Sequence, residues 1–296
     1  MNGPVTVNGP VAVDGPVVAG FDGSPESLAA TAWAAREALR RGLALELLQA
    51  WPWPKRDSVG TNEVYNRSRD ALAAREAELR AAHAGLQVSS RQVPDDPAKA
   101  LETAGRTSAV LVLGSRGLGP VRGFLVGSVS QEVLRRATCP VVLVRAGEGE
   151  QGAATDPVLV GVDLVHPPDD VLAFAFEAAA HRSAPLRIVH VWAPPAGSEY
   201  MAFDAIGGLE KELSASERKQ FADVLALWLA RYPQVTVTSE LVRGNAAIVL
   251  VEASETARLV VLGRHVRRMP LGAHLGPVAH AAIHHVRCPV AVVPDA

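Results

Sequence analysis

An internal repeat constrains the fold of this chain more than any other feature. With a shift of 141 residues, Gly20 and Asp22 of the first half fall on Gly161 and Asp163 of the second. With a shift of 149 residues, the late parts of the two halves align: Gly114, Gly123, Gly127, Cys139, Pro140 and Val141 fall on Gly263, Gly272, Gly276, Cys288, Pro289 and Val290. The two shifts differ by eight residues, which indicates an insertion in the middle of the second copy. The 296 residues therefore predict two copies of one domain of about 140 residues, an ordinary domain size.

Local composition sets the expected domain boundaries. The first domain is expected over residues 15–146 and the second over residues 157–296, with residues 147–156 as a Gly/Ala/polar linker. Residues 1–14 are expected to be a flexible tail, because their Gly-Pro-Val repeats offer little that can be buried.

Charge and hydropathy exclude several classes of partner. The formal net charge is −2, and no basic stripe is interleaved with aromatic residues, so no nucleic-acid partner is expected. The apolar content of 48% is ample for a core, but no run reaches the ~18 apolar residues that a membrane helix needs, so no membrane partner is expected. No cationic start followed by an apolar signal segment is present, which predicts a cytoplasmic location.

Strands and helices are predicted to alternate within each copy. In the first copy, strands are expected at 17–21, 45–51, 86–93, 109–113 and 140–144, and helices at 25–42, at 69–84, after Asp96-Pro97 and at 129–136. Leu28, Trp33 and Leu39 of the first helix are expected to face the core. Five strands separated by helices predict a doubly wound parallel sheet with right-handed crossovers, a Rossmann-like α/β fold that occurs once in each copy.

A glycine-rich loop follows the fourth predicted strand. Gly114-Ser115-Arg116-Gly117 is followed, after nine residues, by Gly127-Ser128 at the start of a helix. Glycines allow close approach of the backbone to a ligand, and the unpaired N–H groups and dipole of a helix N-terminus attract anions. The Ser128 hydroxyl could cap this helix and also hydrogen-bond a phosphate oxygen. The loop is therefore predicted to bind phosphate, with plain turn residues around a βα unit as the alternative.

Two better-known phosphate loops are excluded by the same stretch. No glycine in the chain precedes a lysine, so there is no Walker A loop. Gly117 and Gly119 are followed by Gly123, one residue too late for the dinucleotide GxGxxG pattern.

A second loop is predicted to meet the first. If the first and fourth strands are neighbours, the Gly20–Ser24 loop lies beside the Gly114–Ser128 loop where the strand order reverses, which is the usual ligand site of such sheets. Asp22 could then accept a hydrogen bond from a base or ribose while the glycine loop holds phosphates, an arrangement that suits a nucleotide. The alternative is that Asp22 is only a turn residue, since Asp-Gly-Ser is also a good turn.

These motifs together resemble the universal stress protein family, in its tandem, ATP-binding branch. The resemblance rests on Gly20-Phe21-Asp22-Gly23-Ser24-Pro25, Gly114-Ser115-Arg116-Gly117, the nine-residue gap, Gly127-Ser128 and Cys139-Pro140-Val141-Val142-Leu143-Val144, and extends from about residue 15 to residue 294. It implies an adenine-nucleotide α-hydrolase-like fold, ATP bound without a dedicated catalytic base, a role in stress or dormancy signalling, and dimerisation through the last strands. Any Mg²⁺ would arrive with the nucleotide phosphates.

The resemblance also assigns roles to residues. It implies that Asp22 contacts adenine and that Ala50 lines the adenine pocket. The residues implied to surround ribose and phosphates are Gly114, Arg116, Gly117, Gly127, Ser128, Val129 and Ser130. Gly20, Ser24 and Gly119, from the same two loops, complete the predicted binding set.

The second copy departs from the family pattern. Val266, Pro277 and Ala279 replace Gly117, Ser128 and Ser130, which adds a branched side chain and removes two hydroxyls and one N–H. The second copy is therefore predicted to bind ATP poorly or not at all, with Asp163, Val191, Gly263, His265 and Gly276 as its weaker candidate residues. His280 and His284 lie four apart on a predicted helix, but no carboxylate or cysteine completes a ligand set, so no metal site built from side chains is expected.

Three functions follow as hypotheses. The first is a nucleotide-dependent change of conformation or partner binding, without catalysis beyond weak ATP hydrolysis, because no base, nucleophile or metal constellation is recognisable. The second is a slow ATPase or nucleotidyl-transfer enzyme in which Asp22 or Arg116 assists. The third is an interaction scaffold that binds no ligand. The last strands, at 141–144 and 290–293, are predicted to pair with each other or with a second chain, giving an internal pseudo-dimer or a homodimer.

Overall fold

The computed structural model describes residues 15–51, 61–115, 127–147, 155–165, 169–193, 209–264, 266–269 and 272–294. The elements of the first half are β1 (Val17–Gly20), α1 (Pro25–Arg41), β2 (Leu45–Ala50), α2 (Thr61–Ala82), β3 (Val88–Val93), α3 (Pro97–Gly105), β4 (Val110–Ser115), α4 (Ser128–Arg136) and β5 (Val141–Arg145). Those of the second half are β6 (Val158–Val162), α5 (Asp169–Arg182), β7 (Leu186–Trp192), α6 (Leu209–Arg231), β8 (Val237–Arg243), α7 (Ala246–Ala253), the short 3-10 helix η2 (Ser254–Thr256), β9 (Leu259–Arg264), β10 (Val266–Met269), β11 (Gly272–Leu275), α8 (Pro277–His285) and β12 (Val290–Pro294).

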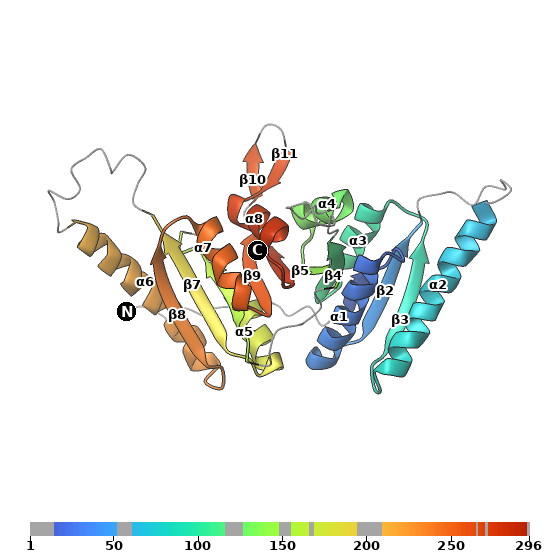
Figure 1. The fold of residues 1–296 in the computed structure, drawn as a ribbon, viewed down its shortest axis with the longest axis horizontal. Coiled ribbons are helices and arrows are strands. Elements are labelled where there is room, and N and C mark those ends of the chain that lie inside the picture. Colours follow the sequence, from blue (N-terminus) through green and yellow to red (C-terminus); the bar gives the residue numbers. More distant parts are fainter. Residues whose placement is uncertain are drawn as a thin grey trace, which may run out of the picture.

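One sheet of ten strands runs through both halves, in the order β3-β2-β1-β4-β5-β12-β9-β6-β7-β8. Within each half the five strands are parallel, and β1 lies beside β4 as predicted. The doubly wound fold is thus confirmed, with the two predicted sheets joined into one. Strands β10 and β11 form a separate antiparallel hairpin, which projects near the middle of the molecule (Figure 1).

Helix α1 illustrates how local sequence sets the bounds of an element. Ser24 is its N-cap and accepts the Ser27 N–H at 3.2 Å, and Pro25 occupies the first helical position. The helix ends at Gly42, whose φ of 67° lies in the left-handed region that favours glycine. The predicted start and end of α1 are therefore confirmed.

Two details of the predicted helices are wrong. Leu28 and Leu39 are each 40% exposed, whereas Trp33 is fully buried, so only one of the three side chains expected in the core lies there. Alanines 30, 34, 35 and 38 occupy the sheet-facing side of α1 instead, because small side chains let a helix pack close to the strands. Helix α2 begins at Thr61 rather than at Arg69.

Helices cover both faces of the sheet, and each face forms a core that continues across the two halves. Helices α1, α2, α5 and α6 pack on one face, and α3, α4, α7 and α8 pack on the other. Successive strand residues alternate between the two cores, as Val17 and Val18 do. Burial on both faces explains why central strands such as β4 and β5 are largely apolar, whereas the edge strands β3 and β8 carry polar residues. None of the described helices is both long and apolar enough to cross a bilayer.

Strands β5 and β12 join the two halves edge to edge. They run antiparallel, with Val142 opposite Ala291, and both of these residues are fully buried. The sequence left open whether the last strands pair within one chain or between chains, and in this structure they pair within the chain. The pairing satisfies two strand edges that an isolated domain would expose.

A buried carboxylate lies across the same junction. Glu37 of α1 is fully buried and accepts hydrogen bonds from Arg41 Nε at 2.6 Å and from Arg182 Nη2 of α5 at 2.5 Å. Each arginine also covers a ring of the opposite half, Arg182 over Trp33 and Arg41 over Phe174, with 5.5 and 5.0 Å between Cζ and the ring centres. Burial raises the pKa of Glu37, but the charges of Arg182 and Arg41 outweigh burial and hold the pKa below its ordinary value.

Substitution of Glu37→Gln should lower the free energy of unfolding by about 3–5 kcal/mol, because Arg182 and Arg41 lose the buried carboxylate to which both donate, and Arg41 keeps only its 3.8 Å contact with Glu177. The matched control is Glu46→Gln, which removes the partly exposed pair between Glu46 and Arg91 and should cost at most about 1 kcal/mol. Urea unfolding followed by circular dichroism at pH 7 would measure both.

The stabilisation by Glu37 should also depend on pH. Because its pKa is lowered in the folded chain, the stabilisation is complete above the ordinary value of 4.5 and is lost as the pH falls through the lower folded value. The stability gap between the wild type and Glu37→Gln should therefore narrow in acid. A gap that stays constant down to about pH 2 would contradict this assignment.

Candidate functional site

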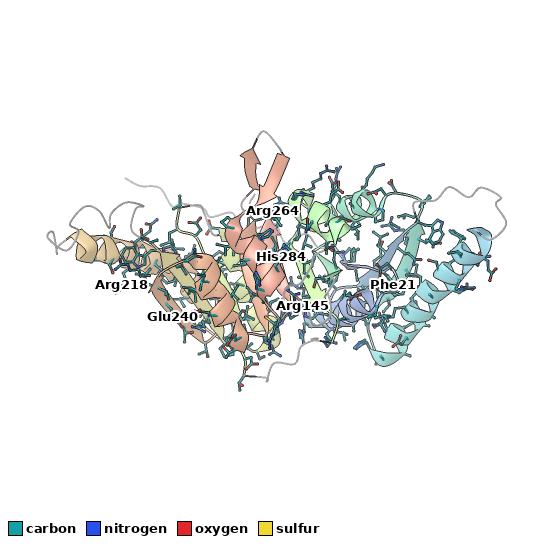
Figure 2. All side chains as sticks on the ribbon, turned by 45° about the horizontal axis from the view of Figure 1, so that its top comes forward. Phe21, Arg145, Arg218, Glu240, Arg264 and His284 are labelled. Atoms are coloured by element: carbon teal, nitrogen blue, oxygen red, sulfur yellow. The ribbon has the colours of Figure 1, made fainter. Side chains whose placement is uncertain are left out.

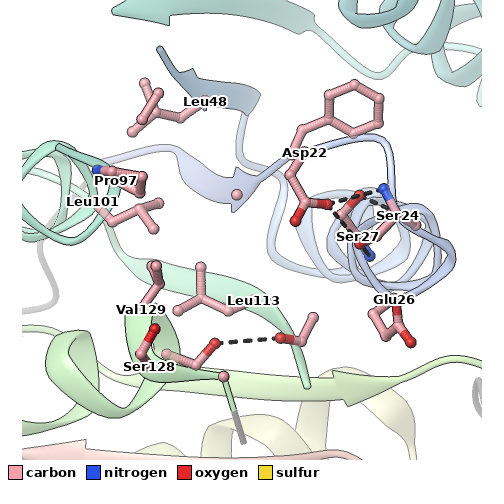
Figure 3. A pocket seen from close by; sticks show the side chains of 16 residues that line it. Asp22, Ser24, Glu26, Ser27, Leu48, Pro97, Leu101, Leu113, Ser128 and Val129 are labelled. Carbon is pink, nitrogen blue, oxygen red and sulfur yellow. Dashed lines mark hydrogen bonds between the residues drawn. The ribbon is translucent and has the colours of Figure 1, made fainter. Parts of the chain in front are cut away.

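A cavity of about 250 Å³ lies where the strand order of the first half reverses, between β1 and β4. The Gly20–Ser24 loop borders one side and the start of α4 borders another (Figure 3). The two loops therefore meet, as the sequence predicted. The volume is close to the lower end of the usual range for small-molecule pockets, about 300–1,000 Å³.

The floor of the cavity is apolar. Leu48 of β2, Leu101 of α3 and Leu113 of β4 line it, and each is at most 6% exposed. Phe21 and Pro97 extend this lining. A flat apolar ring could therefore be covered on this floor without burying an unpaired polar group of the protein.

The carboxylate of Asp22 is held in a turn at the rim. Its Oδ1 accepts the Ser24 N–H at 2.9 Å and the Ser24 hydroxyl at 2.5 Å, while Gly23 has the positive φ of 81° that the turn requires. The turn role considered from the sequence is therefore present. Asp22 is also exposed and lines the cavity, so its side chain combines a turn with a place in the candidate site.

Helix α4 directs an uncapped N-terminus at the cavity. Helices α1, α3 and α7 have Ser24, Asp96 and Asn245 at the N-cap, and each of these side chains accepts a backbone N–H of its own first turn. Helix α4 has Gly127 there, with no side-chain cap. The N–H groups of its first turn have no partner within the helix, and with the helix dipole they favour an anion.

The packing around two glycines of the site, Gly114 and Gly127, differs. A Cβ on Gly114 would lie 2.7 Å from the carbonyl carbon of Glu26, so glycine is required there for α1 to pack against β4. A Cβ on Gly127 would meet none of the described residues within 4 Å, and its φ of −61° suits any residue. Among the residues that the structure describes, neither packing nor backbone conformation therefore requires glycine at position 127.

The cavity brings together most of the predicted residues of the first copy. They are Gly20, Asp22, Ser24, Ala50, Gly114, Gly127, Ser128, Val129 and Ser130. Arg116, Gly117 and Gly119 lie outside the described residues. One detail is wrong: Ser128 does not cap α4 but is its first residue, and Gly127 holds the cap position.

Several residues that line the cavity were not among those predicted from the sequence. They are Phe21, Glu26, Ser27, Leu48, Pro97, Leu101 and Leu113. Most stand at the carboxyl end of a predicted strand or in the first turns of the following helix, and this position was the available signal.

The corresponding part of the second copy keeps the turn and changes the helix start. Asp163 Oδ1 accepts the Val165 N–H at 2.9 Å, which repeats the turn of Asp22. Helix α8 begins with Pro277, which has no N–H, and Ala279 is buried in place of Ser130. The loss at position 279 is the smaller one, because the Ser130 hydroxyl already donates to the Gly114 carbonyl at 3.3 Å.

The other second-copy candidates are more scattered. Val191 lies in β7, Gly263 lies near the end of β9, Gly276 is the N-cap of α8, and His265 lies outside the described residues.

The rings of His280 and His284 lie 4.5 Å apart on α8. Burial, together with the neighbouring His284 and His285, lowers the pKa of His280. The described residues contain no group of three or more His, Cys, Asp or Glu side chains that could hold a metal ion.

Fold and cavity together define a doubly wound α/β protein with a candidate ligand site at a topological switch point. The model of the universal stress protein family matches residues 15–145 and again residues 154–294. A universal stress protein of Mycobacterium tuberculosis is 35% identical over 287 residues, with 93% of this chain and 95% of the relative covered. One of Mycolicibacterium smegmatis is 31% identical over 289 residues, with 93% and 96% covered.

A solved structure supports the same assignment at the level of the fold. The crystal structure of a universal stress protein from Archaeoglobus fulgidus matches with a TM-score of 0.68 at 18% identity, and the match covers 94% of this chain and 98% of that one. The chain belongs to the universal stress protein family and carries two family domains in tandem.

The two glycines should respond oppositely to substitution. Gly114→Ala should destabilise the fold by about 1–3 kcal/mol, because its Cβ would displace the first turn of α1. Gly127→Ser should leave stability unchanged or raise it by roughly a few tenths of a kcal/mol, because it supplies the missing cap and none of the described residues would clash with its Cβ. Thermal unfolding of both variants is the measurement, and equal losses of stability would show that Gly127 is also a packing residue.

Proposed function

We propose that the first half of this chain binds ATP and that the protein acts in stress or dormancy regulation through a nucleotide-dependent change in conformation or partner binding. The observation that carries the proposal is the arrangement of charged, apolar and hydrogen-bonding groups around the cavity. It has a carboxylate at one rim, an apolar floor, and an uncapped helix N-terminus at another side. A ligand that fits must combine a hydrogen-bond donor, a flat apolar part and an anionic part, and an adenine nucleotide has all three.

Each part of the nucleotide has a proposed partner. The adenine ring would lie on Leu48, Leu101 and Ala50, with Asp22 accepting a hydrogen bond from the base or ribose. The phosphates would meet the N–H groups of Ser128, Val129 and Ser130. Arg116, Gly117 and Gly119 belong to the proposed phosphate-binding set, and Mg²⁺ would enter with the phosphates. The family-level expectation of binding without dedicated catalysis, and the cytoplasmic location, remain parts of the proposal.

The second half is proposed to bind ATP poorly or not at all. Pro277 removes one N–H from the helix start that would face phosphate, and a hydroxyl is lost at the same position. One lost hydrogen bond to a charged group is worth about 1.5–3 kcal/mol, or roughly a 10- to 150-fold loss of affinity.

Calorimetry with ATP should therefore give one site per chain. Two equal tight sites would contradict the asymmetry between the halves, and the absence of binding would favour a scaffold without a ligand. Heat-released ligand from purified protein, identified by mass spectrometry, should be an adenine nucleotide. ATP turnover well above background that is lost in Asp22→Ala would instead favour the enzyme hypothesis.

Gly127→Ser should weaken ATP binding by about ten-fold or more while the fold stays intact. The new hydroxyl would accept an N–H of the first turn of α4, which the phosphates are proposed to use. Ser128→Pro is a second variant, because Pro277 shows that this helix position tolerates proline. Unchanged ATP affinity in both variants, measured by calorimetry, would contradict phosphate binding at α4.

A further inference from the structure

The two halves cap each other's helices with arginines. Arg264, the last residue of β9 in the second half, donates from Nη1 to the carbonyls of Ala137 at 2.6 Å and Leu134 at 3.2 Å, at the C-terminus of α4. Arg145, the last residue of β5 in the first half, donates to the carbonyls of Val286 at 2.7 Å and Ile283 at 3.0 Å, at the C-terminus of α8. Figure 2 shows both arginines near the middle of the molecule.

The capped carbonyls are equivalent, but the arginines are not. Val286 and Ile283 lie 149 residues after Ala137 and Leu134, so each half has the same two carbonyls capped by the other half. The position of Arg264 corresponds to Ser115 in the first copy, and that of Arg145 corresponds to Pro294 in the second. Each half therefore supplies its donor from a different position of the repeat, and the repeat alone could not predict either contact.

The arginine at α4 acts on the helix that faces the cavity. The last carbonyls of a helix lack partners within the helix, and a cation there is favourable to the dipole. In the described part of the first half, α4 packs on α3 and β4. The second half supplies Arg264 and also β11, which contacts α4. Both halves therefore contact the helix whose N-terminus borders the cavity.

We propose that Arg264 is a positioning residue for the nucleotide site of the first half, and that the second half tunes phosphate binding through α4. This inference rests on the proposed function, since it concerns the same site. It assigns a task to the degenerate copy: Arg264 fixes one end of α4, and the opposite end of the helix presents its N–H groups to the phosphates. Arg264 would not touch the ligand, so its effect should be limited to ligands that carry phosphate.

The test compares Arg264→Met with Arg145→Met in the full chain. Both variants remove an arginine cap from the same junction and keep an apolar stem, but only the first acts on α4. ATP and adenosine affinities would be measured by calorimetry, together with thermal unfolding. Arg264→Met should weaken ATP binding by about five-fold or more and leave adenosine binding unchanged, whereas Arg145→Met should leave both affinities unchanged. Arg264→Lys, which keeps the charge but not the fork of donors, should fall between Arg264→Met and the wild type.

The outcomes separate the inference from the function on which it rests. If the wild type binds ATP and Arg264→Met binds it equally well, the positioning role is wrong. If Arg145→Met weakens ATP binding as much as Arg264→Met does, the effect is a general weakening of the contacts between the two halves, and the inference fails. It also fails if Arg264→Met weakens adenosine binding as much as ATP binding. If the wild type binds no ATP, the proposed function fails and the inference falls with it. Where Arg264→Met does not fold, faster amide exchange at 128–130 in Arg264→Lys than in the wild type would support the proposal, and unchanged exchange would overturn it.

Discussion

The antiparallel pairing of β5 with β12 is the constraint on which the rest of the structure depends. Each of these strands is an unbroken apolar run at the end of a five-stranded parallel sheet, and alone each would expose an edge. Pairing buries both edges and creates one continuous core on each face of the sheet. The same junction brings Glu37 beside Arg182. It also places Arg145 at the C-terminus of α8 and Arg264 at the C-terminus of α4, each in the opposite half. Helix positions at the centre of the molecule are therefore set by both domains together.

The two copies share one framework but differ at the start of the helix that follows the fourth strand of each domain. Both keep an aspartate that closes a turn after the first strand of the domain, so the aspartate by itself does not distinguish the two copies. The difference lies at the helix start, where Ser128 contributes an N–H and Pro277 has none. Helices α3 and α7 carry a capping side chain, Asp96 or Asn245, whereas α4 and α8 have Gly127 and Gly276 at the cap and no side-chain cap. In α4 all of the first-turn N–H groups are present to meet an anion, whereas Pro277 removes one of them from α8.

Sequence reasoning succeeded where local rules decide the structure. The caps at Ser24 and Asp96, the stop at Gly42, and the adjacency of β1 and β4 all followed from residue type and alternation. It failed at Leu28 and Leu39, because hydrophobicity alone does not reveal that small alanines suit the close approach of α1 to the sheet. It could not predict the arginine caps, because their donors occupy non-equivalent positions and act across the junction. Part of the candidate site was visible as motifs, but no motif marked the leucines of its floor, Leu48, Leu101 and Leu113.

The buried Glu37 has a consequence for the pairing of the two halves. The equivalent residue in the second half is Ala178, while Arg41 and Arg182 correspond to each other. In a pair of second halves, Ala178 would take the place of Glu37, and Glu177, which lies 3.8 Å from Arg41 in this structure, would be the carboxylate left near the two arginines. The fully buried acid is present in one copy and not in the other, so the two halves are not interchangeable at this junction. A symmetric pair of either half would therefore bury a different set of charges from the set that the single chain neutralises.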